Sequence, residues 1–188
     1  HLAFVELMVR EQTIKNVLAL LSDEKNRAIS DWPKKLTGAH QLLDSVKCSV
    51  VKILELVLGA LTKCNKPQLI STFSNQLKSF SGLMKEVLVA LEVTAINTDD
   101  KMRGGQTRKQ VRMGLIATMF KTPDLEKFAT HEFFANGGID FIIRNGGLKL
   151  DTNDELNQLI VGEHLSLLTQ LSVESKDCYP AIHAMNPY

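Results

Sequence analysis

A group of basic side chains around residue 107 is the local charge pattern best suited to binding an anion. These residues are Lys101, Arg103, Arg108, Lys109 and Arg112. Cations around the first turn of a helix oppose its dipole, so this basic cluster is mildly unfavourable unless an anion lies close by. Asp99 and Asp100 offer local neutralisation. The alternative is an acidic or phosphorylated peptide segment that the cluster binds by charge-assisted hydrogen bonds.

The histidines and cysteines lack the spacing of a metal site or a catalytic nucleophile. His40, Cys48 and Cys64 are not paired at the short intervals that zinc ligands show. The string that begins at His131 has Ala135 where a zinc protease would carry its second histidine. No Gly-x-Ser-x-Gly sequence occurs either. We therefore expect no metal, no cofactor and no catalytic residue, and an enzyme is a remote alternative.

The composition predicts an all-α protein. Of its 188 residues, 44% are hydrophobic and 23% charged, the net charge is +1, and no segment alternates polar with apolar residues. A net charge this small argues against binding of nucleic acid, and the one Arg-Gly-Gly sequence has no aromatic residues nearby on which bases could stack. An RNA-binding module is therefore a second remote alternative. No stretch approaches the ~20 apolar residues that span a bilayer. The three cysteines lie in amphipathic patterns, which predicts reduced core thiols in a cytoplasmic protein.

Three long helices are predicted over residues 1–97, where they would form an antiparallel up-and-down bundle. The first covers Leu2 to Leu21 and the third starts at Pro67. The second, Leu36 to Cys64, has the clearest pattern, because apolar residues recur at alternating spacings of four and three. That core stripe consists of Ala39, Leu43, Val46, Val50, Ile53, Val57, Ala60 and Cys64, and it is widened by Leu42, Leu54, Leu58 and Leu61.

Residues 98–106 are rich in turn formers and predict a linker or mobile loop between two parts of the chain. After this loop, helices are expected over Thr107 to Phe120 and over Leu125 to Asn136. Gly137-Gly138 and Gly146-Gly147 have the character of helix C-caps, since glycine adopts a positive φ without strain. A capped longer helix follows from Glu155 to Leu171.

This order of elements over 107–188 resembles armadillo repeats, and HEAT repeats are similar. The resemblance implies that residues 107–188 form armadillo-like α-solenoid repeats, incomplete at the C-terminus, with Glu155 to Leu171 lining a concave groove. Where peptide-binding members of the family carry a tryptophan and an asparagine, this chain has Ser166 and Gln170. A long-helix bundle followed by such repeats is also similar in layout to polarity adaptors of the Inscuteable type, and the bundle alone to vinculin and α-catenin modules.

The resulting prediction is a non-catalytic intracellular scaffold or adaptor that binds a protein or peptide segment through a repeat groove or a bundle face. The candidate partner-binding residues are Arg108, Arg112, Glu163, Ser166 and Gln170, of which the last three share one helix face. A cytoskeleton-linked bundle of the vinculin type is the main alternative. Assembly into a homo-oligomer is left open.

Overall fold

The computed structural model describes residues 2–11, 13–22, 37–93, 108–138 and 169. Every regular element in this part of the chain is an α-helix, which confirms the all-α prediction. The helices are α1 (Leu2–Arg10), α2 (Thr13–Ala19), α4 (Thr37–Lys63), α5 (Pro67–Lys78), α6 (Leu83–Val93), α7 (Arg108–Phe120) and α8 (Pro123–Ala135). No described helix is long and apolar enough to cross a membrane.

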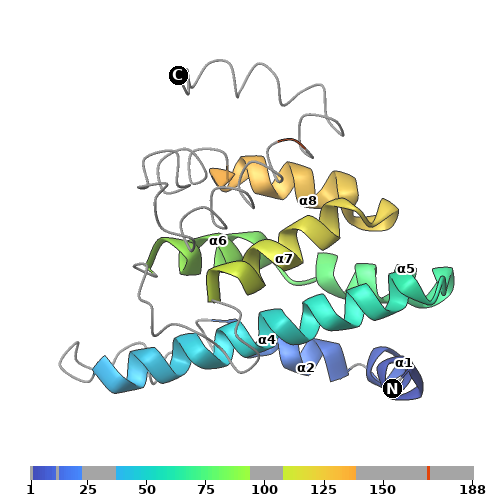
Figure 1. Ribbon diagram of the computed structural model, residues 1–188, viewed down its shortest axis with the longest axis horizontal. Helices are drawn as coiled ribbons and strands as arrows, with labels where there is room; N and C mark the ends of the chain where they lie inside the picture. The colour runs from blue at the N-terminus through green and yellow to red at the C-terminus, as the bar shows by residue number, and fades with distance from the viewer. Residues whose placement is uncertain (1, 12, 23–36, 94–107, 139–168, 170–188) are drawn as a thin grey trace, which may run out of the picture.

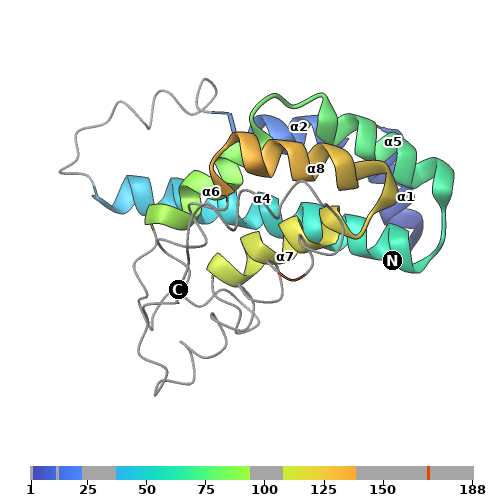
Figure 2. The same cartoon turned by 90° about the horizontal axis from the view of Figure 1, so that it is seen from above.

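Helix α4 is the longest element, with 27 residues, and the other helices are arranged along it (Figure 1). Its most extensive contact is with α7, and α7 in turn packs against α8, so that α7 lies between these two helices. Helices α1, α2 and α5 also contact α4. In the view from above these three helices lie toward the right side of the molecule (Figure 2). The bounds predicted for this helix, Leu36 to Cys64, differ from the observed ones by one residue at each end.

The single helix predicted from Leu2 to Leu21 is wrong, because the structure has two helices there. Val9 and Ile14 are both fully buried, although one continuous helix would point residues five apart in different directions. The Gln76 side-chain amide, from α5, donates a hydrogen bond of 2.9 Å to the Val9 carbonyl oxygen. An outside donor thus occupies a carbonyl where α1 ends, and the chain changes direction so that both apolar residues reach the core.

The third long helix predicted from Pro67 is also wrong, because it is divided into α5 and α6. Gly82 has φ +86°, a left-handed conformation that an α-helix cannot contain. The Ser79 hydroxyl donates to the Gln76 carbonyl at 2.7 Å and satisfies an acceptor at the end of α5. After this turn α6 packs on α7 and α8. Residues 37–93 therefore do not form two long antiparallel helices.

The predictions for residues 107–138 hold closely. Helix α7 starts one residue after the predicted start and ends at Phe120 as expected, and α8 ends at Ala135. Gly137 has φ +74°, which confirms the first of the two glycine caps. Phe120 and Phe133 pack edge to face, with ring centroids 5.6 Å apart, and join α7 to α8. The second cap and the expected groove helix lie outside the described residues.

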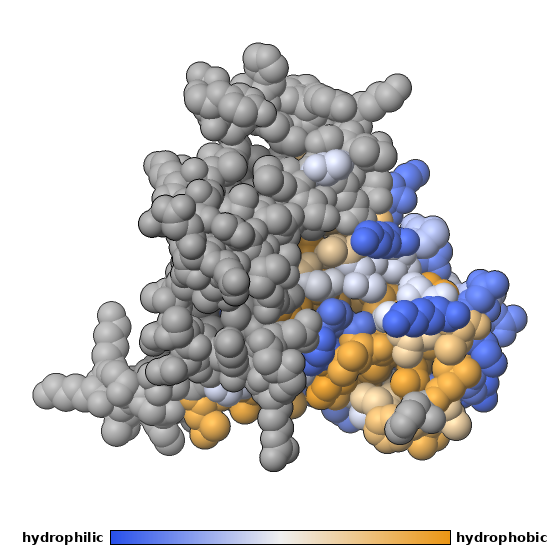
Figure 3. Space-filling model, in the orientation of Figure 1, coloured by the Kyte–Doolittle hydropathy of each residue, from blue (hydrophilic) through white to orange (hydrophobic). Residues whose placement is uncertain are grey.

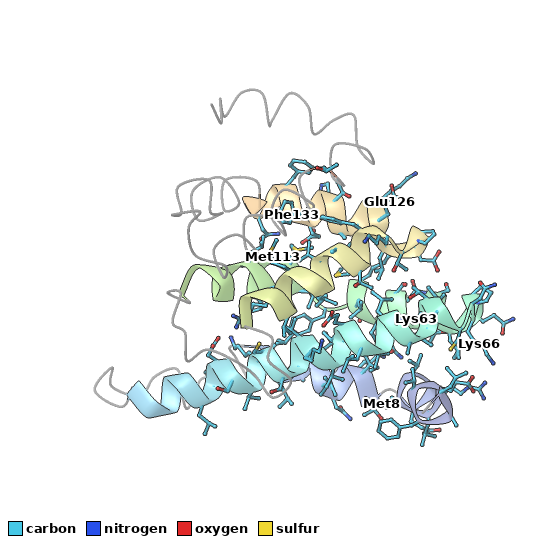
Figure 4. The ribbon with its side chains drawn as sticks, in the orientation of Figure 1. Met8, Lys63, Lys66, Met113, Glu126 and Phe133 are labelled. Atoms are coloured by element: carbon cyan, nitrogen blue, oxygen red, sulfur yellow. The ribbon has the colours of Figure 1, made fainter. Side chains whose placement is uncertain are left out.

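One hydrophobic core extends through all the described helices. It includes Ile14 of α2, Leu54 of α4, Phe73 of α5, Val87 of α6, Leu115 of α7 and Phe133 of α8, each at most 1% exposed. The loop expected at 98–106 lies outside the described residues, but the helices on its two sides share this core. In Figure 4, Phe133 and Met113 lie between α8 and α7.

Candidate binding surface on α4

Helix α4 is apolar on two of its sides, and only one of them is covered. The buried side packs against neighbouring helices with side chains that are at most 4% exposed. These are Val50, Val51, Leu54, Val57, Leu58 and Leu61. The second side carries large apolar residues that remain accessible. A helix of 27 residues with two apolar sides has more apolar surface than α1, α2, α5 and α7 cover.

The accessible side of α4 is a line of four apolar residues, which we call the α4 line. Leu42 is 65% exposed, Val46 38%, Ile53 37% and Leu56 58%. Ser49, also exposed, lies in the middle of the line. Successive positions of the line are separated by four, three, four and three residues, which aligns them along one face of the helix. Isolated exposed apolar residues are common on protein surfaces, whereas contiguous apolar patches are typical of interaction sites, which makes this row a candidate.

Further accessible apolar residues lie on the helices that accompany α4. Phe4 and Leu7 on α1 are 65% and 55% exposed, and Leu20, directly after α2, is 46% exposed. The space-filling view shows hydrophobic surface over the α1 and α2 end of the molecule and along the lower edge of α4 (Figure 3). Met8 of α1 lies near this end (Figure 4). The α4 line is thus part of a wider apolar region.

Ion pairs on the covered side hold α4 in a fixed orientation. The Arg112 guanidinium of α7 donates from Nη2 to Oδ1 of Asp44 at 2.6 Å, and the Arg112 side chain is fully buried. Lys47 Nζ lies 2.8 Å from Oε2 of Glu86 on α6. By the 3.6-residue turn of a helix, Asp44 is roughly opposite the α4 line. These pairs fix α4 against α6 and α7 and leave the line facing outwards.

Of the candidate binding residues predicted from the sequence, the structure describes the side chain of Arg112 alone. Arg112 was expected in an accessible basic cluster, but it is fully buried and pairs with Asp44. It therefore stabilises the packing of α7 against α4. Arg108 is the first residue of α7, and its side chain is not among those described. Glu163, Ser166 and Gln170 lie outside the described residues, as do Lys101 and Arg103. The basic cluster and the groove face thus stay predictions, except that Arg112 is not an accessible cation.

A small open pocket lies where two inter-helix turns meet. It has a volume of about 340 Å³ and is lined by Thr62, Asn65, Pro67, Ile70, Lys121, Pro123 and Asp124. The turn from α4 to α5 uses Asn65 with φ +48°, and α5 and α8 both begin with proline. The lining offers one amine and one carboxylate beside prolines and an isoleucine, without convergent polar groups that would suit a particular reaction.

No cluster of metal-binding side chains occurs among the residues that the structure describes. Cys48 is buried as predicted, but the prediction that Cys64 is a core thiol is wrong, because this thiol is exposed and free. Cys64 directly follows the last residue of α4, and the chain turns away through Asn65 before any helix can cover it. Lys63 and Lys66 lie at the same end of α4 (Figure 4).

Sequence reasoning missed the α4 line, although its signal was present. The predicted core stripe, with the residues that widen it, contained Val46, Ile53 and Leu42, which are 38%, 37% and 65% exposed, and it omitted Leu56. Between residues 42 and 61, apolar residues follow two overlapping series with the same spacings. An excess of apolar residues over what one packing face requires would have indicated a second face.

Comparison with protein-family models, with curated proteins and with solved structures found no match for this chain.

Proposed function

We propose that this protein is a non-catalytic binding module that uses the α4 line to hold a helical segment of a protein partner. The supporting observation is the row formed by Leu42, Val46, Ile53 and Leu56, each between 37% and 65% exposed. An amphipathic helix places its own apolar residues at the same spacings, so it fits such a row side by side. Of the two predicted binding modes, a bundle face and a repeat groove, this observation favours the bundle face.

The rigidity of α4 supports a binding role. Its opposite side is held by a fully buried core and by the Arg112–Asp44 and Lys47–Glu86 pairs, so a partner need not order the helix on binding. This differs from a vinculin-type mechanism, in which a helix must first be released from its bundle. We therefore place the adaptor role before the cytoskeletal alternative.

An intracellular location belongs to the same proposal. The thiol of Cys64 is exposed and free, which suits a reducing compartment. We keep the expectation of a cytoplasmic adaptor on this ground. The partner would be a protein segment rather than a small molecule, since the exposed feature is an extended row and not a deep pocket.

A site-specific photo-crosslinker at position 56 tests the proposed function. Benzoylphenylalanine replaces Leu56 in one variant and Lys127, an exposed residue of α8, in the control. After irradiation in cell extract, mass spectrometry identifies the crosslinked proteins. We expect a defined adduct from position 56 that Leu42→Glu removes, because one charge in an apolar contact weakens it at least tenfold. The proposal fails if position 56 gives no adduct or only the adducts that position 127 gives.

A further inference from the structure

The α4 line has the residue order of a two-stranded coiled coil. Leu42, Ser49 and Leu56 are seven residues apart, and Val46 and Ile53 form a second series of seven between them. In the heptad notation the first series occupies d and the second occupies a. Leucine at d with β-branched residues at a favours two parallel helices over higher assemblies. The order and identity of the exposed residues therefore indicate a two-stranded coiled coil, and not only a hydrophobic surface.

We propose that the α4 line pairs with the α4 line of a second copy of this chain, as a parallel two-helix seam. This inference rests on the proposed function, because it names the partner of the same face. Parallel pairing in register sets each residue of the line beside its own counterpart. Both copies then bring the residue types that the d and a positions require.

The middle of the line can be buried without leaving a polar donor unsatisfied. Ser49 is the polar residue in the row, and its hydroxyl donates to the Ser45 carbonyl oxygen within α4 at 2.9 Å. A serine that makes this bond inside its own helix needs no donor or acceptor from the partner. Charged residues are absent from the line itself between Leu42 and Leu56. The seam would thus contain no charged residue, and its one polar side chain would have its hydroxyl bonded within its own helix.

The exposed apolar area is of the size that a dimer needs. Large apolar side chains offer on the order of 200 Å² each, so the four exposed fractions on α4 correspond to roughly 400 Å². Phe4, Leu7 and Leu20 raise this value to roughly 700 Å². A stable interface buries about 800 Å² on each partner. A dimer seated on α4 and extended by α1 and the end of α2 approaches that size.

The position of Lys52 favours the parallel arrangement. Lys52 borders the line and pairs with Glu55 of its own helix at 2.8 Å. An antiparallel pairing that matches all four apolar residues would set Lys52 of the two copies on the same side of the seam. In the parallel pairing the two lysines lie on opposite sides of the seam, where neither faces a like charge.

Analytical ultracentrifugation of the 188-residue chain tests self-association from low micromolar to several hundred micromolar protein. We expect a monomer–dimer equilibrium whose dissociation constant rises at least tenfold with Leu56→Glu. Gln68→Glu, an equally charged change at an exposed position of α5, is the control and should leave the constant unchanged. A chain that stays monomeric, or a dimer that Leu56→Glu does not weaken, would overturn the inference.

Cysteine crosslinking tests the direction of the seam. In a chain with Cys64→Ser and Cys178→Ser, the variant Ser49→Cys should form a disulfide-linked dimer under mild oxidation, because facing d positions lie within disulfide range. Ile53→Cys should do the same. An antiparallel seam that matches all four apolar residues also sets Ser49 beside its own counterpart, but it sets Ile53 beside Val46. In that seam Ile53→Cys links to a Val46→Cys chain and not to itself, and this outcome contradicts the parallel pairing.

The two proposals fail in different ways. A monomeric chain that still crosslinks to a different protein through position 56 removes the self-pairing and keeps the binding module. A monomeric chain without any adduct at position 56 removes both. A crosslink between two copies at position 56 supports both.

Discussion

The two apolar sides of α4 have similar residues and opposite surroundings. Leu54, on one side, is fully buried, whereas Leu56, two positions later, is 58% exposed. Both are leucines of the same helix, so neither residue type nor helix propensity explains the difference. The neighbours decide it, because α7 and its ion pairs lie against one side. A leucine on the first side contributes to folding, and one on the second is available for binding.

Truncation of these two leucines should separate the roles most clearly. Leu54→Ala should lower the free energy of unfolding by about 2 to 5 kcal/mol, since it removes buried methyl groups and leaves a cavity. Leu56→Ala should change it by less than about 0.5 kcal/mol when the protein is dilute enough to be monomeric. Urea unfolding followed by circular dichroism measures both values. Equal losses would show that the α4 line is covered in the folded monomer.

The ion pair behind α4 provides the next comparison. Asp44→Ala should cost about 3 kcal/mol, because it takes an anionic partner from a guanidinium that is fully buried. Arg112→Met keeps most of the side-chain volume and removes the charge, and the carboxylate of Asp44, 27% exposed, can still reach water. The loss should then be smaller, at about 1 to 2 kcal/mol. The reverse order in urea unfolding would mean that the contacts of the Arg112 stem, and not the pair, hold α7 to α4.

Much of the fold could be predicted from periodicity. The bounds of α4 and α7 were accurate to one residue, because long amphipathic patterns and flanking turn residues define them locally. The break after α1 could not be placed, since Val9 accepts a hydrogen bond from Gln76 far along the chain. The break after α5 is local, at Gly82 with φ +86°, where one glycine was outweighed by the apolar periodicity on both sides. At the end of α1, the predicted helix failed because a tertiary contact replaced a bond within the helix.

The candidate site was harder to predict than the fold. A stripe of apolar residues shows that a helix has a partner, but not which partner covers which stripe. For α4, Val46 and Ile53 fitted the core stripe by spacing and are partly exposed. Arg112 fitted a surface cluster by its charge and is fully buried beside Asp44. Both errors have the same cause, because burial is decided by neighbours that are distant in the sequence.

Two glycines should respond oppositely to alanine. Gly82 has φ +86° in the turn between α5 and α6, so Gly82→Ala should destabilise the protein by about 1 kcal/mol. Gly59 lies within α4, and an added Cβ there would meet no atom within 4 Å. Gly59→Ala should therefore stabilise the protein by about 0.5 to 1 kcal/mol through helix propensity. Thermal unfolding checks both, and a stable Gly82→Ala variant would argue against the division of α5 from α6.

The smallest effect is expected at the pair between Lys66 and Glu6. Lys66 Nζ lies 3.1 Å from Oε1 of Glu6 and joins α1 to the turn after α4, but the lysine side chain is 48% exposed. Exposed pairs contribute at most about 1 kcal/mol, so Glu6→Gln should lower stability by less than that and lose its effect in high salt.

The change at Glu6 is informative because α1 carries Phe4 and Leu7, which extend the apolar region beside the α4 line. Hydrogen exchange of the α1 amides should increase slightly in Glu6→Gln, while that of α4 stays unchanged, since α4 is anchored by α7 on its other side. If α4 amides exchange faster as well, then the packing of α1 also stabilises α4. The surface would then depend on α1, and binding at the α4 line could be regulated through this exposed ion pair.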